Sequence, residues 1–246
     1  MRPAGLTVLA LLVAGACGTP APAKPAETAA APTKAPEAPV AADTTHPAPA
    51  ASAQPSPQQT NDAADRSVGA RTMGGPRSPI TIYEVSDFQC PFCRDFFENT
   101  LPAVKREFVG SGKVRLIFVN FPITQLHPNA LAAHEFAMCA ADQGKFWPVH
   151  DLLYHHQEGW AKLQDPRPFF YELADSAQLA RDALRNCLMT GAVRGLLQAD
   201  MQSALRAGIH STPSFIINGA LLAGAVPMKD LRPILDSVYR AATAPH

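Results

Sequence analysis

A stretch rich in alanine and proline limits the part of this chain that can fold into a compact domain. The forty-two positions from Thr19 to Thr60 hold fourteen Ala, ten Pro and no Phe, Tyr or Trp, and Val40 is their only larger aliphatic residue. Such a segment buries too little apolar surface to offset its conformational entropy. Residues 17–79 are therefore expected to form a disordered linker, and residues 80–246 are expected to form one folded domain.

The first residues carry the pattern of an export signal. Arg2 precedes the apolar run from Leu6 to Val13, and small residues then lead to Cys17. The run is shorter than the roughly 20 apolar residues of a membrane-spanning helix, so residues 1–16 are expected to be a signal peptide. The segment Ala14–Cys17 resembles the lipobox of bacterial lipoproteins, although Ala14 stands where Leu is most frequent. The resemblance implies a lipid on Cys17, and ordinary cleavage without lipidation is the alternative.

Export places the other cysteines in a compartment where disulfides persist. Cys90 and Cys93 form a C-x-x-C motif, which leaves Cys139 and Cys187 as the natural second pair. Two unpaired buried cysteines are the alternative for that second pair. Lys+Arg and Asp+Glu both number 21, so the chain has no strong electrostatic field to attract nucleic acid.

The C-x-x-C motif follows a predicted strand and begins a predicted helix. Residues Ile80 to Val85 are rich in β-branched and aromatic side chains, as a buried strand requires. Pro91 suits the first position of a helix, and Phe92 and Phe96 recur at the i, i+4 spacing of an inward face. A second buried strand, from Lys113 to Asn120, completes a β-α-β unit.

The position of the motif indicates redox chemistry. A thiol at a helix N-terminus faces free backbone N–H groups and the positive end of the helix dipole, so the pKa of Cys90 is expected to be lowered. Cys93, one turn further, can attack a mixed disulfide formed by Cys90. A static disulfide and half of a metal site are the alternatives. A zinc site needs four ligands at paired spacings, so no metal is expected, and the histidines, among them His127, His134 and His150, are expected on solvated helix faces.

Three motifs occur in a fixed order along the chain: Ser86–Cys93, Gly144–Trp147 and Gly208–Gly219. Together they resemble the DsbA family of thioredoxin-fold thiol:disulfide oxidoreductases, over residues 80 to about 240. The resemblance implies an α/β thioredoxin fold, in which a β-α-β unit is followed by a β-β-α unit. A helical subdomain, about residues 125–207, is inserted between the two units. No cofactor is expected.

Two helical patterns mark the insertion. Asn129 to Gln143 and Gln178 to Leu188 each place apolar side chains at helical spacing, with Cys139 and Cys187 on the apolar faces. A disulfide between them closes a loop of about fifty residues. The lost chain entropy of the unfolded state would stabilise the fold by at most roughly 4 kcal/mol. This pair is expected to be structural.

The closing unit begins at Thr212-Pro213. The family resemblance implies that this peptide bond is cis, that Pro213 packs against the C-x-x-C motif and that Thr212 offers its backbone to an extended substrate segment. Phe215 to Leu222, with Asn-Gly at its centre, predicts a hairpin of two strands, and a last helix is expected from about Pro227 to Arg240.

Glu84 interrupts the first strand on the face that Ile80 and Ile82 share. It lies six residues before Cys90, where thioredoxin-fold proteins commonly hold a buried acid. Burial would raise its pKa and let it accept the proton that Cys93 releases. The alternative is a Glu at the edge of the sheet that reaches solvent.

The favoured function is a monomeric oxidase that donates disulfides to reduced, unfolded exported proteins, with Pro91, Phe92, Thr212 and Pro213 contacting the substrate. Phe92 has no hydrogen-bond donor, whereas strongly oxidising relatives have a His between the cysteines, so a milder oxidant is expected. The family implies a quinone-linked membrane oxidase as redox partner, on the periplasmic side of a bacterial cell envelope. The alternatives are an envelope thiol reductase fed by a membrane electron donor and a tethered peptide-binding module with an inert disulfide.

Overall fold

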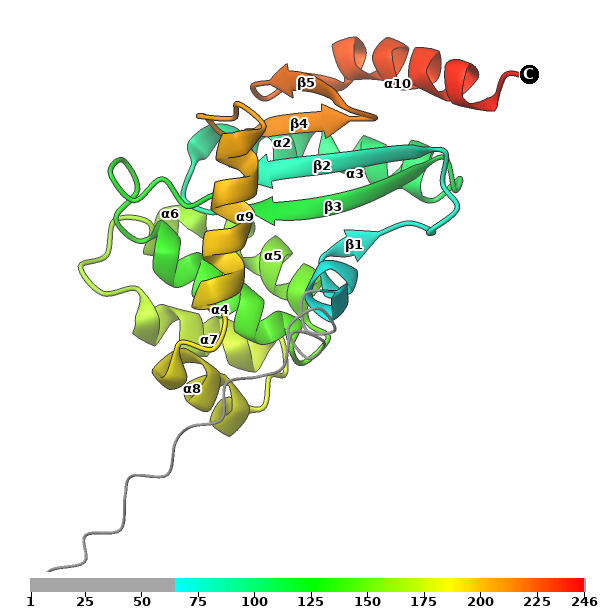
Figure 1. Cartoon of the computed structure of the whole chain (residues 1–246). Helices are drawn as coiled ribbons and strands as arrows, with labels where there is room; N and C mark the ends of the chain where they lie inside the picture. The colour runs from blue at the N-terminus through cyan, green and yellow to red at the C-terminus, as the bar shows by residue number, and fades with distance from the viewer. Residues whose placement is uncertain (1–64, 246) are drawn as a thin grey trace, which may run out of the picture. The chain divides into compact units, whose positions relative to one another are not determined.

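The computed structural model describes residues 65–245, whose five strands form one mixed sheet in the order β1-β3-β2-β4-β5 (Figure 1). The strands are β1 (Thr72–Met73), β2 (Ile80–Ser86), β3 (Val114–Asn120), β4 (Ser214–Ile217) and β5 (Ala220–Ala223). β2 and β3 run parallel, and the other pairs are antiparallel. The expected signal peptide, Cys17 and the Ala/Pro-rich segment lie outside the described residues.

Apart from the helical residues 65–70 before β1, the helices of the described residues fall into three groups along the chain: one follows β2, one separates β3 from β4, and one follows β5. They are α2 (Pro91–Asn99), α3 (Leu101–Val104) and the π-helix η1 (Lys105–Val109); α4 (Ala130–Ala141), α5 (Phe146–His155), α6 (Gln157–Trp160), α7 (Arg167–Ser176), α8 (Arg181–Thr190) and α9 (Arg194–Arg206); and α10 (Met228–Thr243). The expected thioredoxin arrangement, with a helical insertion between its two units, is confirmed.

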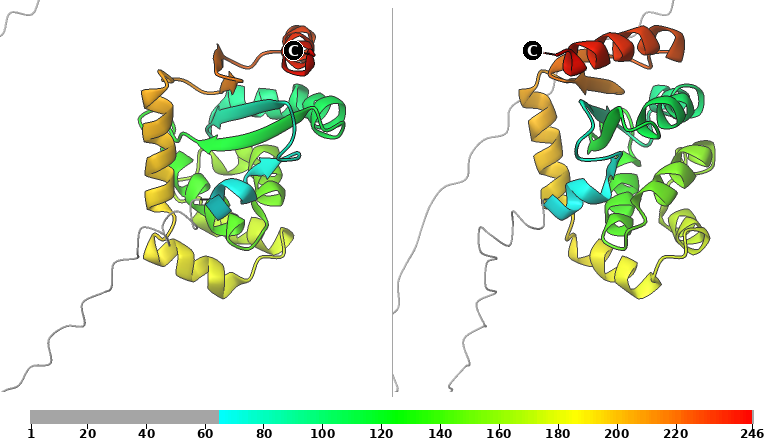
Figure 2. Two further views of the ribbon diagram at one scale, coloured as in Figure 1. Left: turned by 45° about the vertical axis from the view of Figure 1, so that its right-hand side comes forward. Right: turned by 90° about the vertical axis from the view of Figure 1, so that its right-hand side faces the viewer.

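The two faces of the sheet carry different layers. On one face Ile80 and Ile82 join the main core, together with the buried side chains of α2 and of the inserted helices. On the other face Val85 packs with Ala204 of α9 and with Ile209. Figure 2 shows α9 on one side of the strands and α2 and α3 on the other. The strand alternation therefore decides which residues of β2 lie beneath the C-x-x-C helix.

The folded domain begins before the predicted boundary at Ile80. β1 pairs with β3, residues 65–70 are helical, and the side chain of Arg71 is only 2% exposed. Arg71 donates to the carbonyl oxygen of Phe118 at 2.8 Å and to the carboxylate of Asp200 at 2.5 Å. The prediction of a linker up to residue 79 was wrong, because a two-residue strand held by one buried arginine leaves no hydrophobic periodicity in the sequence.

A disulfide ties two helices of the insertion together. It joins Cys139 of α4 to Cys187 of α8, which are 48 positions apart. The two helices occupy the segments that the apolar pattern predicted, with ends that differ by one to three residues. Among the described residues, no helix has both the length and the apolar character needed to cross a membrane.

Candidate active site

The turn between β2 and α2 holds the two cysteines. Cys90 directly precedes Pro91, the first residue of α2, and Cys93 lies in the first turn of that helix. Both are free thiols and both are buried, Cys90 being 4% exposed and Cys93 fully covered. Cys90 is therefore the cysteine nearer to the surface, as a nucleophile that meets a protein substrate must be.

The surroundings move the pKa values of the two thiols in opposite directions. Hydrogen bonding from the Cys93 thiol, followed by that from Thr212 and from the N–H groups of Cys93 and Phe92, lowers the pKa of Cys90 from 9.0 to about 6. Burial raises the pKa of Cys93 well above its ordinary value. At neutral pH Cys90 is thus mainly a thiolate, while Cys93 keeps its proton.

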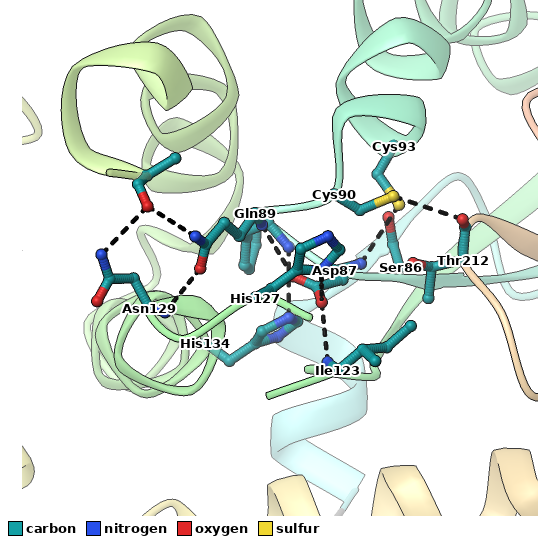
Figure 3. Close-up of polar contacts among 12 residues, drawn as sticks. Ser86, Asp87, Gln89, Cys90, Cys93, Ile123, His127, Asn129, His134 and Thr212 are labelled. Carbon is teal, nitrogen blue, oxygen red and sulfur yellow. Dashed lines mark hydrogen bonds and ion pairs between the residues drawn. The ribbon is translucent and has the colours of Figure 1, made fainter. Parts of the chain in front are cut away.

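The loop before β4 faces Cys90. The Thr212-Pro213 peptide bond is cis, and the carbonyl oxygen of Thr212 lies 3.5 Å from the Sγ atom of Cys90 (Figure 3). Pro213 has no N–H group, so the chain next to Cys90 cannot pair there as a regular strand. The backbone of this loop, next to the two cysteines, is therefore free to pair with a substrate chain.

Glu84 lies inside the molecule, on the core face of β2. Its partners on the neighbouring strands are Phe118 and Phe215, and its side chain is 1% exposed. Burial raises the pKa of this carboxyl from 4.5 to about 7. Burial raises the pKa of Tyr154, and the negative charges of Cys93 and Glu84 raise it further.

Phe92 lies at the surface rather than on the inward face that its spacing with Phe96 predicted. Its side chain is 65% exposed and Phe96 is 2% exposed. Pro91, in the same first turn of α2, is exposed as well. No other element of the described residues covers this part of the turn, so the i, i+4 spacing with Phe96 does not place Phe92 in the core. An exposed aromatic side chain therefore stands between the two cysteines.

Side chains of the insertion hold the redox turn in place, and the sequence analysis did not single them out. Gln157 of α6 donates to the carbonyl oxygens of Phe88 and Cys90, at 2.7 and 3.0 Å. The side chain of Gln89 donates to Ala161 at 2.7 Å and accepts from the N–H of Asn129, also at 2.7 Å (Figure 3). Gln89 stands within the Ser86–Cys93 motif, which was the only signal for this contact.

Asp87 is a second residue that the sequence analysis quoted without assigning a role. Its side chain is fully buried. One carboxylate oxygen accepts from the N–H of Gln89 at 2.8 Å, and the other accepts from the N–H of Ile123 and meets Nδ1 of His127, both at 2.8 Å. The backbone N–H of Asp87 also points at Sγ of Cys93, at 3.5 Å. Asp87 therefore connects the cysteines to the loop after β3.

The prediction that the histidines lie on solvated helix faces was wrong for His127, which lies in a loop, and for His134 and His150. The latter two are fully buried, because α4 and α5 are covered on several sides by the sheet and by other inserted helices. Burial lowers the pKa of His134 to about 4. Its Nδ1 atom lies 2.8 Å from the amide oxygen of Asn120, and its Nε2 atom accepts from the N–H of Phe88 at 3.4 Å.

Comparisons with known proteins agree with this geometry. The Thioredoxin family model matches residues 66–237. The chain is 33% identical over 170 residues to the Na(+)/H(+) antiporter NhaA 3 of Salinispora tropica, covering 68% of this chain and 24% of the antiporter. It thus spans about a quarter of that relative. A probable disulfide bond formation protein D of Bacillus anthracis is 27% identical over 155 residues, covering 61% of this chain and 70% of the relative.

Solved structures share the fold. BdbD from Bacillus subtilis, in its oxidised form, superposes with a TM-score of 0.64 at 18% identity, over 70% of this chain and 95% of that one. α-DsbA1 of Wolbachia pipientis gives a TM-score of 0.63 at 23% identity, over 70% of this chain and 92% of that one. Because the family model matches most of the described residues, this chain belongs to the thioredoxin family.

Proposed function

We propose that this protein is a thiol:disulfide oxidoreductase that donates disulfides to reduced exported polypeptides through Cys90 and Cys93. The observation that carries the proposal is the difference in pKa and position between the two cysteines. A thiolate with a pKa of about 6 lies at the N-terminus of α2, and a fully buried thiol of raised pKa lies one turn below it. Relatives named for disulfide bond formation support the oxidising direction.

The oxidised protein holds a Cys90–Cys93 disulfide. A substrate thiolate attacks Sγ of Cys90, the Cys90–Cys93 bond breaks, and Cys93 leaves with the electron pair and takes up a proton. A second substrate thiolate then attacks the mixed disulfide at the substrate sulfur and releases Cys90 as a thiolate. The low pKa of Cys90 makes it a good leaving group in this second step, so the geometry favours donation of the disulfide.

Glu84 is proposed as the proton carrier for Cys93. A carboxyl with a pKa of about 7 exchanges its proton near neutral pH. It can give a proton when Cys93 leaves, and it can accept one when Cys93 attacks. Its place among Phe118 and Phe215 keeps this proton away from bulk water.

The substrate is proposed to lie in extended form over Pro91, Phe92, Thr212 and Pro213. The backbone beside the cis bond offers hydrogen-bonding groups that do not depend on side-chain identity. The exposed Phe92 ring adds an apolar contact next to Cys90. Such a surface suits unfolded polypeptides of varied sequence.

Cys17 is proposed to carry a lipid anchor, with the Ala/Pro-rich segment as the tether, on the periplasmic side of a bacterial envelope. A membrane redox partner, a quinone-linked oxidase, is proposed to reoxidise the pair. Labelling with a radioactive fatty acid tests the anchor, because an unlipidated Cys17 would take up none. The protein is proposed to act as a monomer.

The direction of electron flow is tested by mixing the oxidised protein with reduced, unfolded RNase. An oxidase restores RNase activity while Cys90 and Cys93 become reduced in equal amount. A reductase leaves RNase reduced, and in a separate assay its dithiol form, regenerated by dithiothreitol, cleaves the disulfides of insulin. A peptide-binding module with an inert disulfide does neither.

Phe92→His is expected to make the pair a stronger oxidant. The imidazole adds a hydrogen-bond donor near the Cys90 thiolate, and a decrease of one pKa unit corresponds to a rise of about 30 mV in the two-electron potential. A glutathione redox titration measures the shift. Phe92→Leu adds no donor and serves as the control, and an unchanged potential in Phe92→His would contradict the expectation.

A further inference from the structure

His127 lies in the loop between β3 and α4, outside the C-x-x-C helix. Its Nδ1 atom is 2.8 Å from a carboxylate oxygen of Asp87 (Figure 3), and its side chain is 17% exposed while that of Asp87 is fully buried. The other hydrogen-bond partners of the Asp87 carboxylate are the N–H groups of Gln89 and Ile123. The carboxylate is thus fixed by the backbone, and it fixes the imidazole.

The imidazole ring faces the same groove as the redox turn. A groove of about 540 Å³ is lined by His127 and by Gln89 and Pro91, the two residues that flank Cys90. The ionisable side chains that line the groove with His127 are Arg94, Asp95, Glu98, Glu158 and Lys162. Arg94 is paired with Glu98 and Glu158, at 2.8 and 2.6 Å.

The charge of His127 interacts with that of Cys90. The hydrogen bond to Asp87 is the main cause that raises the pKa of His127, and the negative charge of Cys90 adds to it. An interaction between two charges is mutual, so a protonated His127 also favours the thiolate of Cys90. Glu84 in β2 and Asp87, directly after that strand, are acids and supply no positive charge. Phe92, which stands between the two cysteines in the sequence, carries no positive charge either.

We propose that His127, oriented by Asp87, supplies the positive charge that stabilises the Cys90 thiolate and takes up a proton when the disulfide is reduced. This inference rests on the proposed thiol:disulfide exchange. When a substrate dithiol is oxidised, two electrons pass to the Cys90–Cys93 disulfide and two protons are released. Cys93 takes one proton as its thiol, Cys90 remains a thiolate, and His127 holds the second proton.

The test uses His127→Asn in the full chain. The asparagine amide can replace Nδ1–H as a donor to Asp87, but it cannot carry charge. The alkylation rate of Cys90 by iodoacetamide at pH 6 is expected to fall about fivefold, with the midpoint of the rate profile moved to higher pH. The equilibrium with glutathione is expected to shift about fivefold toward the protein disulfide, or about 20 mV.

Two matched variants separate charge from packing. His127→Lys keeps a positive donor and is expected to stay near the wild-type rate and equilibrium, while His156→Asn removes an exposed histidine elsewhere and is expected to change neither. Unchanged values in His127→Asn, or equal shifts in His127→Asn and His127→Lys, would overturn the proposal. Both readouts report on Cys90 itself, so they remain measurable even if the wild-type protein fails to oxidise RNase.

The wild-type protein provides a measurement that does not depend on the variants folding. NMR titration of the His127 ring is expected to show a higher pKa in the reduced protein than in the oxidised one, because only the reduced protein has the thiolate. Equal midpoints for His127 in the two redox states would also overturn the proposal.

Discussion

Cys90→Ser is expected to lower the rate of RNase oxidation by about 10³-fold or more, the scale on which removal of a nucleophile acts in other enzymes. The wild-type thiol, with a pKa of about 6, holds about ten thiolates per thiol at pH 7. A serine hydroxyl neither ionises in this range nor forms a disulfide. The same variant is expected to lose the fast phase of iodoacetamide alkylation, which in the wild-type protein rises with pH through about 6.

Cys93→Ser is the matched control for this prediction. It keeps the nucleophile but removes the resolving thiol. When the Cys90 thiolate attacks a disulfide-bonded substrate and releases one substrate thiolate, the mixed disulfide is therefore expected to accumulate and to be visible on a non-reducing gel. The Cys139–Cys187 disulfide is present in both variants. Full RNase oxidation by Cys90→Ser, or alkylation of the wild-type pair with the pH profile of an ordinary thiol, would remove the basis of the proposed function.

Local composition was enough to predict the buried strands. Ile80 to Val85 is rich in β-branched and aromatic residues, Lys113 to Asn120 holds a run of large apolar residues, and the structure has β2 and β3 there. The hairpin of β4 and β5 follows from its Asn-Gly turn, since Asn218 and Gly219 both adopt positive φ, at 45° and 91°. These features depend on near neighbours in sequence, which is why one sequence reveals them.

The N-terminal boundary and the polar contacts of the site depend on residues far apart in sequence. Arg71 and Asp200 are 129 positions apart, and Asp87 meets His127 forty positions away. Neither pair has a spacing that identifies it. The burial of His134 likewise depends on which helices cover α4. The sequence of α4 alone is compatible with an exposed helix or a buried one, so the exposed position predicted for His134 was wrong.

Arg71 begins a buried polar chain that reaches the redox turn. Its guanidinium contacts the carboxylate of Asp200, and the same carboxylate accepts from the side-chain amide of Asn120 at 2.7 Å. Asn120 contacts His134, which accepts from the N–H of Phe88, two residues before Cys90. The segment before β1 is therefore connected to the active site through side chains that are buried, except for that of Asp200, which is 18% exposed.

Arg71→Met is expected to lower the free energy of unfolding by about 3 kcal/mol, because it leaves the Asp200 carboxylate without its buried counter-charge. For a domain of this size that corresponds to a decrease of about 6–12 °C in Tm. Urea unfolding of the oxidised protein, followed by circular dichroism, measures the change. The buried carbonyl oxygen of Phe118 loses a donor in the same variant, which adds to the effect.

Arg106→Met is the matched control, since Arg106 is 69% exposed and its partner is the adjacent Glu107. A change below about 0.5 kcal/mol is expected there. The double variant Arg71→Met/Asp200→Asn removes the uncompensated charge while keeping an acceptor for Asn120, so it is expected to be more stable than Arg71→Met alone. If Arg71→Met were no less stable than Arg106→Met, the segment before Ile80 would not belong to the cooperative unit that holds Cys90 and Cys93.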